Sequence, residues 1–145
     1  MEFHKKYSHV GISYPEVPNG WLPIVEKAIQ AIEKEMWPRW IPMPLCRLIH
    51  WLAMGNSIVR IKYHWAFELR QRLTRGQMIT DIKEKYATLR IYGFFGDEID
   101  VIIDQAEKEC NDTCQECGTR GNVHRINVGW VYNVCDTCAD IIRNR

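Results

Sequence analysis

Near its C-terminal end the chain reads Cys114-Gln-Glu-Cys117-Gly118, and seventeen residues after Cys117 it reads Cys135-Asp-Thr-Cys138. Two cysteines three positions apart can chelate one metal ion from a tight turn, and this C-x2-C-x17-C-x2-C spacing is typical of structural zinc sites. Four thiolates complete a tetrahedron and leave no open position for water or substrate. We therefore expect one structural Zn²⁺ ion; the alternative is two disulfides or four free cysteines.

The segments between the two cysteine pairs predict a β-hairpin. Residues 123–128 and 130–134 can pair across a turn at 127–129, which is the layout of a zinc ribbon. Of the two other cysteines, Cys46 is predicted to be a small buried residue. Cys110 lies four residues before Cys114; we expect it to face the core or the end of its helix, and the alternative is that it competes as a ligand.

Composition places the chain among soluble globular proteins. Its 145 residues are 46% apolar and 26% charged, and the net charge of +1 excludes a strongly basic nucleic-acid coat. The most apolar stretch, 45–54, contains Arg47 and His50 and is far shorter than the ~20 residues of a membrane span. We expect a cytoplasmic protein. Residues 39–75 are basic and 76–113 acidic, so the two segments either neutralise each other or present two faces of opposite sign.

The fold class that these patterns predict is α+β, with a small mixed, mostly helical domain and a C-terminal zinc ribbon packed on it. The domain covers residues 1–113, with a basic, tryptophan-rich insert at 37–78, and the ribbon covers 114–145. Short strands are expected around 87–95. Apolar residues at helical spacing predict four helices, at 23–36, 45–54, 57–75 and 97–110.

Particular residues define these helices. Three prolines make 37–44 a stiff linker, and Asp97 is expected to cap the last helix. Ser57 is expected to begin the third helix and Gly76 to end it. The apolar stripe of that third helix is predicted to consist of Ile58, Ile61, Trp65, Leu69 and Leu73.

The insert combines aromatic and basic residues, which is the composition of binding hot spots and of base-stacking surfaces. Core packing is the first interpretation of these tryptophans, and an interaction surface is the alternative. If the insert is a surface, we expect the following residues to bind a partner: Trp37, Arg39, Trp40, Arg60, Lys62, Arg70, Arg72 and Arg75.

No catalytic constellation can be identified in the sequence. The Cys114–Gly118 run followed by Val123-His124 is similar to the start of zinc-supported nucleases of the His-Asn-His type. However, Arg125 stands where those nucleases have a second histidine, and no histidine follows it. We therefore expect a protein that is not an enzyme, with His124 as a strand residue; a degenerate nuclease of the His-Asn-His type is the third alternative.

A second resemblance covers residues 19–32 and 79–140. The run Lys83-Glu-Lys-Tyr-Ala-Thr-Leu-Arg-Ile-Tyr92, an acidic helix, the Cys-x2-Cys-Gly knuckle and Gly129-Trp130 before the last cysteine pair together resemble a family of small phage and prophage proteins. Ala87 replaces the usual glycine, and Cys138 stands where many members have histidine. The insert has no counterpart in that family.

The resemblance implies a phage accessory protein. We expect it to bind a host protein or nucleoprotein, for instance as an anti-defence or host-takeover inhibitor, with no membrane and no small-molecule substrate. The alternative is nucleic-acid binding in replication, recombination or transcription, with arginines and lysines on phosphates and tryptophans stacked on bases.

Overall fold

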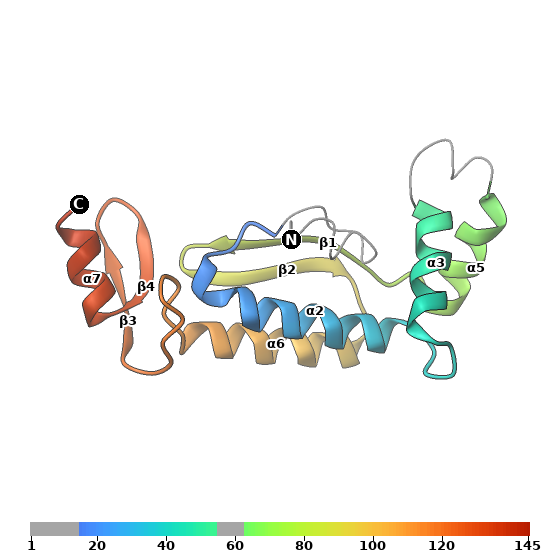
Figure 1. The fold of residues 1–145 in the computed structure, drawn as a ribbon, viewed down its shortest axis with the longest axis horizontal. Helices are drawn as coiled ribbons and strands as arrows, with labels where there is room; N and C mark the ends of the chain where they lie inside the picture. Colours follow the sequence, from blue (N-terminus) through green and yellow to red (C-terminus); the bar gives the residue numbers. More distant parts are fainter. Residues whose placement is uncertain (1–14, 55–62) are drawn as a thin grey trace.

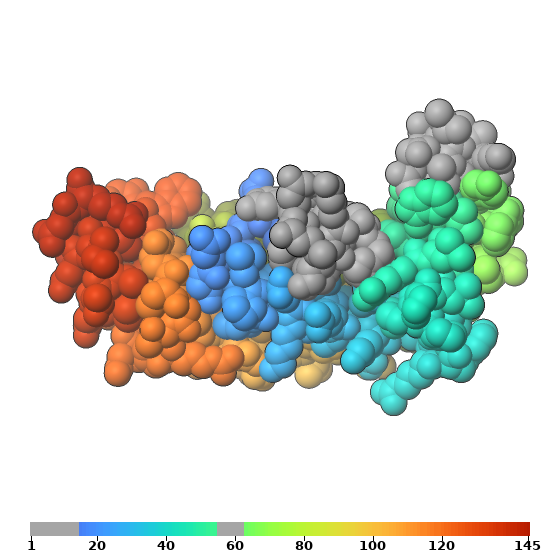
Figure 2. All heavy atoms as spheres, in the orientation of Figure 1, coloured from blue at the N-terminus to red at the C-terminus, as the bar shows by residue number. Residues whose placement is uncertain are grey.

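The computed structural model describes residues 15–54 and 63–145. In these residues a β-hairpin is covered on one face by two long antiparallel helices, a helical hairpin stands at one end, and a small cysteine-rich unit stands at the other (Figure 1). The molecule is elongated as a result, as the space-filling view shows (Figure 2). The expected α+β class with a C-terminal cysteine cluster, consistent with a zinc ribbon, is confirmed.

The two long helices form as their apolar spacing predicts. Helix α2 (Leu22–Met36) follows a 3-10 turn, η2 (Asn19–Trp21), and carries Pro23 in its first turn, where the missing donor costs nothing. It ends at Trp37, whose extended backbone is what the following Pro38 requires. Helix α6 (Asp97–Asn111) buries Ile99, Ile103 and Ala106. The expectation that Asp97 caps α6 was wrong, because Gly96 is the N-cap and Asp97 is the first helical residue.

The β-hairpin is longer than the sequence indicated. Strands β1 (Met78–Lys85) and β2 (Thr88–Phe94) pair antiparallel, whereas only 87–95 was expected to be extended. A bulge between Ile79 and Asp81 interrupts the alternation of β1, so that Ile79 and Ile82 both face the core at a spacing of three. A spacing of three is typical of a helix, so the sequence pattern did not indicate a strand at these residues.

The insert forms a helical hairpin of α3 (Met43–Met54) and α5 (His64–Thr74). Helix α3 begins inside the expected linker, because Pro44 in a first turn is compatible with a helix. Of the predicted stripe, Ile58 and Ile61 lie outside the described residues, as does Ser57. The stripe was wrong for Trp65 and Leu69, which are exposed. The face that α5 buries is formed by Ala66, Arg70 and Thr74.

The C-terminal unit contains β3 (Val123–Asn127) and β4 (Val131–Cys135), paired as expected, and then α7 (Asp136–Arg143), which was not foreseen. Two groups of buried side chains exist in the described residues. One joins α2, α3, the first hairpin and α6, and the other joins β3, β4 and α7 around Cys114.

The two-residue turn between β1 and β2 is strained. Tyr86 and Ala87 both have positive φ, at 53° and 58°. This is the backbone of a turn that normally takes asparagine and glycine, because a side chain in the left-handed region costs about 1–2 kcal/mol.

We expect Ala87→Gly to raise the free energy of unfolding by about 0.5–1 kcal/mol. Glycine removes the strain that a side chain causes at positive φ, and this gain exceeds the entropic cost of ordering the more flexible glycine. Urea unfolding measures the change. The control is Ala31→Gly on α2, which should lower stability by about 1 kcal/mol. Losses of equal size in both variants would contradict the assignment of strain.

Candidate functional site

Four cysteines from three segments converge in the C-terminal unit. Cys114 and Cys117 lie in the turn that follows α6, Cys135 ends β4, and Cys138 lies in the first turn of α7. The second pair therefore uses a strand end and a helix start rather than a second tight turn. In the described part of the chain, this is the only group of three or more histidine, cysteine or acidic side chains close enough to hold a metal ion.

The distances fit one tetrahedral ion. All four sulfur atoms lie within 4.8 Å of one another, and the Sγ atoms of Cys117 and Cys135 are 3.7 Å apart. A tetrahedron with metal–sulfur bonds of about 2.3 Å has edges of roughly 3.8 Å. The cluster can hold one metal ion with no large rearrangement.

The backbone conformation of the first cysteine turn brings the thiols of Cys114 and Cys117 close together. The Gly118 amide donates to the Cys114 carbonyl oxygen at 2.9 Å, and the Cys114 amide donates to the Thr119 carbonyl oxygen at 2.8 Å. Gly118 adopts a φ of 77°, which a side chain would strain. The turn thus directs two thiols at one point.

The thiols have divergent proton affinities. Contacts with Thr119, first through its hydroxyl and then through its backbone, lower the pKa of Cys117 to about 6. Burial raises the pKa of Cys138, and its contacts with Cys135, Cys117 and Cys114 raise it further. Four adjacent thiolates repel one another unless a cation lies between them, which is the electrostatic condition of a metal site.

A reciprocal pair of buried polar residues fixes the turn to β4. The backbone amide of Gln115 donates to the Asn133 carbonyl oxygen at 3.0 Å, and the backbone amide of Asn133 donates to Gln115 Oε1 at 2.9 Å. Asn133 Nδ2 donates to the Asn111 carbonyl oxygen at 2.8 Å, which ties β4 to the end of α6. Sequence reasoning missed both residues, because nothing in the spacing distinguishes them from solvated polar residues.

The same turn packs against the start of α2. The Gly20 amide donates to the Gln115 carbonyl oxygen at 2.9 Å, and the fully buried Trp21 donates from Nε1 to the Thr113 carbonyl oxygen at 3.0 Å. A Cβ atom on Gly20 would lie 2.2 Å from the Cys114 carbonyl oxygen. Only glycine fits there, so residues 20 and 21 join the cysteine turn to the main core.

The residues expected to bind a partner divide into three groups. Arg60 and Lys62 lie outside the described residues. Trp37 and Arg70 are 5% and 1% exposed, so neither can contact a partner in this structure. The other four side chains are exposed, namely those of Arg39, Trp40, Arg72 and Arg75.

Arg70 has a structural role. Its Nε donates to His50 Nδ1 at 3.0 Å and its Nη2 donates to the Gln77 carbonyl oxygen at 3.0 Å, which ties α5 to α3 and to the residue before β1. Burial lowers the pKa of the guanidinium.

Apolar side chains cover the outward face of the helical hairpin. On α3, Leu45, Leu48 and Trp51 are 47%, 50% and 57% exposed and recur every three residues, opposite the face that packs on the core. Trp65 on α5 is 57% exposed and Trp40 is 79% exposed. Most tryptophans of the insert are therefore at the surface, while Trp37 belongs to the core.

His124 lies on β3, as expected, with Nδ1 3.5 Å from a carboxylate oxygen of Asp136. No metal-binding group of described residues includes it.

Comparisons with protein-family models, with curated proteins and with solved structures find no match to this chain. No helix among the described residues is both long enough and apolar enough to cross a membrane.

We expect Gly20→Ala to lower the free energy of unfolding by about 2–3 kcal/mol, because its methyl group collides with backbone rather than with a flexible side chain. The control is Gly96→Ala, whose Cβ would meet the Glu98 carboxylate at 3.3 Å and should cost less than about 1 kcal/mol. Thermal unfolding of both variants provides the comparison. Equal losses would show that the contact of Gly20 with the cysteine turn is loose.

Removing one ligand should remove the metal. We expect Cys117→Ser to bind less than a tenth of the zinc of the parent protein, since three thiolates and a hydroxyl form a weaker site. Metal analysis and the absorption spectrum of the Co²⁺-substituted protein measure the amount of bound metal. Cys110→Ser changes a buried cysteine outside the cluster and should keep one equivalent. Retention of the full equivalent by Cys117→Ser would refute the ligand assignment.

Proposed function

We propose that the four cysteines hold one structural zinc ion in a protein without catalytic activity that binds another protein. The argument for a structural ion is coordination, because four thiolates leave no position for a substrate or a reactive water. Zinc fits the all-sulfur donor set and the tetrahedral distances better than harder cations do. The cytoplasm, whose reducing conditions keep thiols available for metal, is the compartment in which such a site is stable.

The observation that supports the proposed function is that the outward face of α3 is both apolar and exposed. A helix whose buried and exposed faces are both apolar has a second surface to cover, and Leu45, Leu48 and Trp51 form that surface. Exposed apolar patches of this kind mark interaction sites in soluble proteins, and tryptophan is the side chain most enriched in their energetic centres.

Charge defines the chemistry of the partner. Arg39, Arg72 and Arg75 are exposed, and none forms an ion pair with any described residue. A partner that covers the apolar face presents apolar side chains to it, and one that also contacts these cations presents acidic groups to them. In the setting that the phage-protein resemblance implies, this partner is a host protein or the protein component of a nucleoprotein, and its inhibition is the biological effect.

Nucleic acid is the second candidate, favoured by one observation. Arg39 is followed by Trp40, the most exposed tryptophan of the described residues, and a free guanidinium beside an open indole suits a phosphate and a stacked base. Against it, the arginines of α5 do not form one stripe, since Arg70 points into the protein.

The test is an affinity capture from host lysate with tagged, zinc-loaded protein, with and without nuclease. We expect one partner protein that survives nuclease and that, once purified, binds Trp51→Ser at least tenfold more weakly than the parent. The matched control is Trp130→Ser, because Trp130 is 59% exposed and lies in the ribbon at the other end of the molecule.

Three results would overturn the proposal. Loss of capture on nuclease treatment would favour nucleic acid. Equal weakening by Trp51→Ser and Trp130→Ser would exclude the α3 face as the specific surface. Capture of nothing under either condition would leave protein binding without support.

A further inference from the structure

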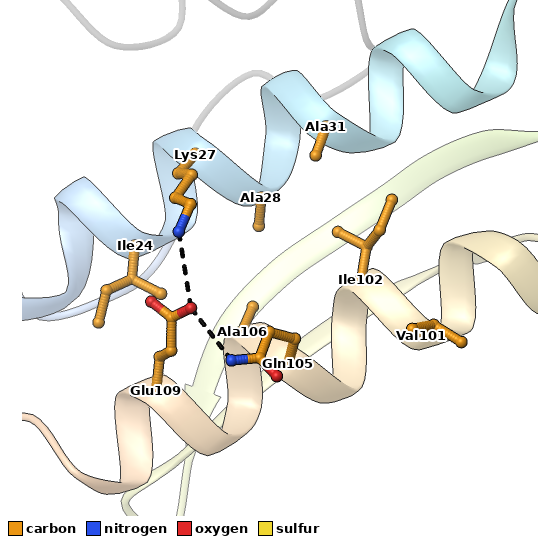
Figure 3. A pocket seen from close by; sticks show the side chains of 9 residues that line it. All are labelled: Ile24, Lys27, Ala28, Ala31, Val101, Ile102, Gln105, Ala106 and Glu109. Carbon is orange, nitrogen blue, oxygen red and sulfur yellow. Dashed lines mark hydrogen bonds and ion pairs between the residues drawn. The ribbon is translucent and has the colours of Figure 1, made fainter.

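A groove runs along the outer side of the α2–α6 pair, away from the β-hairpin. A hollow of about 320 Å³ lies between the two helices, and side chains from both point into it (Figure 3). Its apolar lining comes from α2 and α6 alike, and consists of Ile24, Ala28, Ala31, Val101, Ile102 and Ala106. Half of these residues are alanines, which are too small to close the space between the helices. Val101, on its rim, is 67% exposed.

The groove continues beyond this hollow. A second hollow of about 440 Å³ shares Ala31 and Ile102 with the first and extends to Pro38, Ile41 and Met43. Along α2 the two hollows span residues 24–35, which corresponds to about 16 Å or three helical turns. The result is an elongated apolar channel, open to solvent along its length.

The two ends of the channel differ in charge. At one end Lys27 Nζ lies 3.7 Å from Glu109 Oε1, and Gln105 donates to the same oxygen at 3.3 Å, so this end is internally satisfied. At the other end, Lys34 and Arg39 form no ion pair with any described residue, and Glu35 is the one carboxylate among the residues that line the second hollow. The charged side chains that line the second hollow, two cations and one carboxylate, therefore carry a net charge of +1.

We propose that this groove binds an amphipathic helix of a partner protein, with the apolar stripe of that helix between α2 and α6 and its acidic residues beside Lys34 and Arg39. A helix with anchors at positions i, i+3 or i+4 and i+7 matches a channel that is open along its length and two to three turns long. Helices pack on one another by placing the ridges of one into the grooves of the other, so a groove between helices is a surface on which a further helix can pack. The lining of this site includes none of the apolar residues Leu45, Leu48 and Trp51 of the α3 face, and Arg39 is the one residue that both proposals use.

The experiment uses a synthetic probe. A capped peptide of about 18 residues, with leucines at i, i+3/i+4 spacing and glutamates along one flank, is titrated into the full-length, zinc-loaded, ¹⁵N-labelled protein. We expect saturable amide shifts confined to α2, α6 and residues 38–43. A peptide with lysines in place of the glutamates should bind at least fivefold more weakly.

Variants locate the site. Ala31→Phe fills the channel at the point where the two hollows meet and should abolish binding, whereas Gln30→Phe adds the same ring on an exposed part of α2 outside the lining. Lys34→Glu should weaken the acidic peptide at least fivefold. Lys108→Glu, an exposed lysine of α6 outside the lining, should not. Lys34→Glu keeps the test decisive if Ala31→Phe fails to fold.

Several outcomes would overturn the inference. These are shifts confined to α3 and α5, equal affinity for the acidic and basic peptides, or unchanged binding by Ala31→Phe. Concentration-dependent shifts of the same residues without peptide would assign the groove to a second copy of the chain. Displacement of the peptide by decanoate at equimolar concentration would assign it to an aliphatic ligand. Because Trp51 and Trp130 do not line the groove, these results are independent of the test of the α3 face.

Discussion

The architecture depends on the contact between Gly20-Trp21 and the first cysteine turn. The turn has few apolar side chains of its own, and it is joined to the main core by one backbone hydrogen bond from Gly20 and by the indole of Trp21. Trp21 is at the same time fully buried in the main core and precedes α2. A metal ion that orders the turn would therefore also order the start of α2, so that metal binding and core packing stabilise each other.

The parts that the sequence predicted are those governed by short-range rules. The cysteine spacing predicted the cluster because ligand identity and turn geometry are nearly sufficient for a metal site. The apolar periodicity of α2 and α6 predicted both helices for a similar reason, since each buries one regular stripe against a single neighbouring layer.

The parts that it missed depend on contacts between distant segments. The bulge in β1 is a property of the pairing with β2, and it gave Ile79 and Ile82 a helical spacing. Arg70 was interpreted as a surface residue because arginine usually is; its burial depends on His50, twenty residues earlier, and on the Gln77 carbonyl group. Gln115 and Asn133 are likewise ordinary polar residues until the fold pairs them.

The position of the α3–α5 hairpin between α2 and β1 has a consequence for how the protein can change over time. The hairpin is one continuous stretch of chain, and only its inner side, with Cys46 and Ile49, belongs to the main core. Its outer side is constrained by neither the core nor the cysteine cluster. Substitutions on this outer side can change which molecule the hairpin binds without changing the core or the cysteine cluster. Proteins that share this fold would therefore diverge fastest at this face.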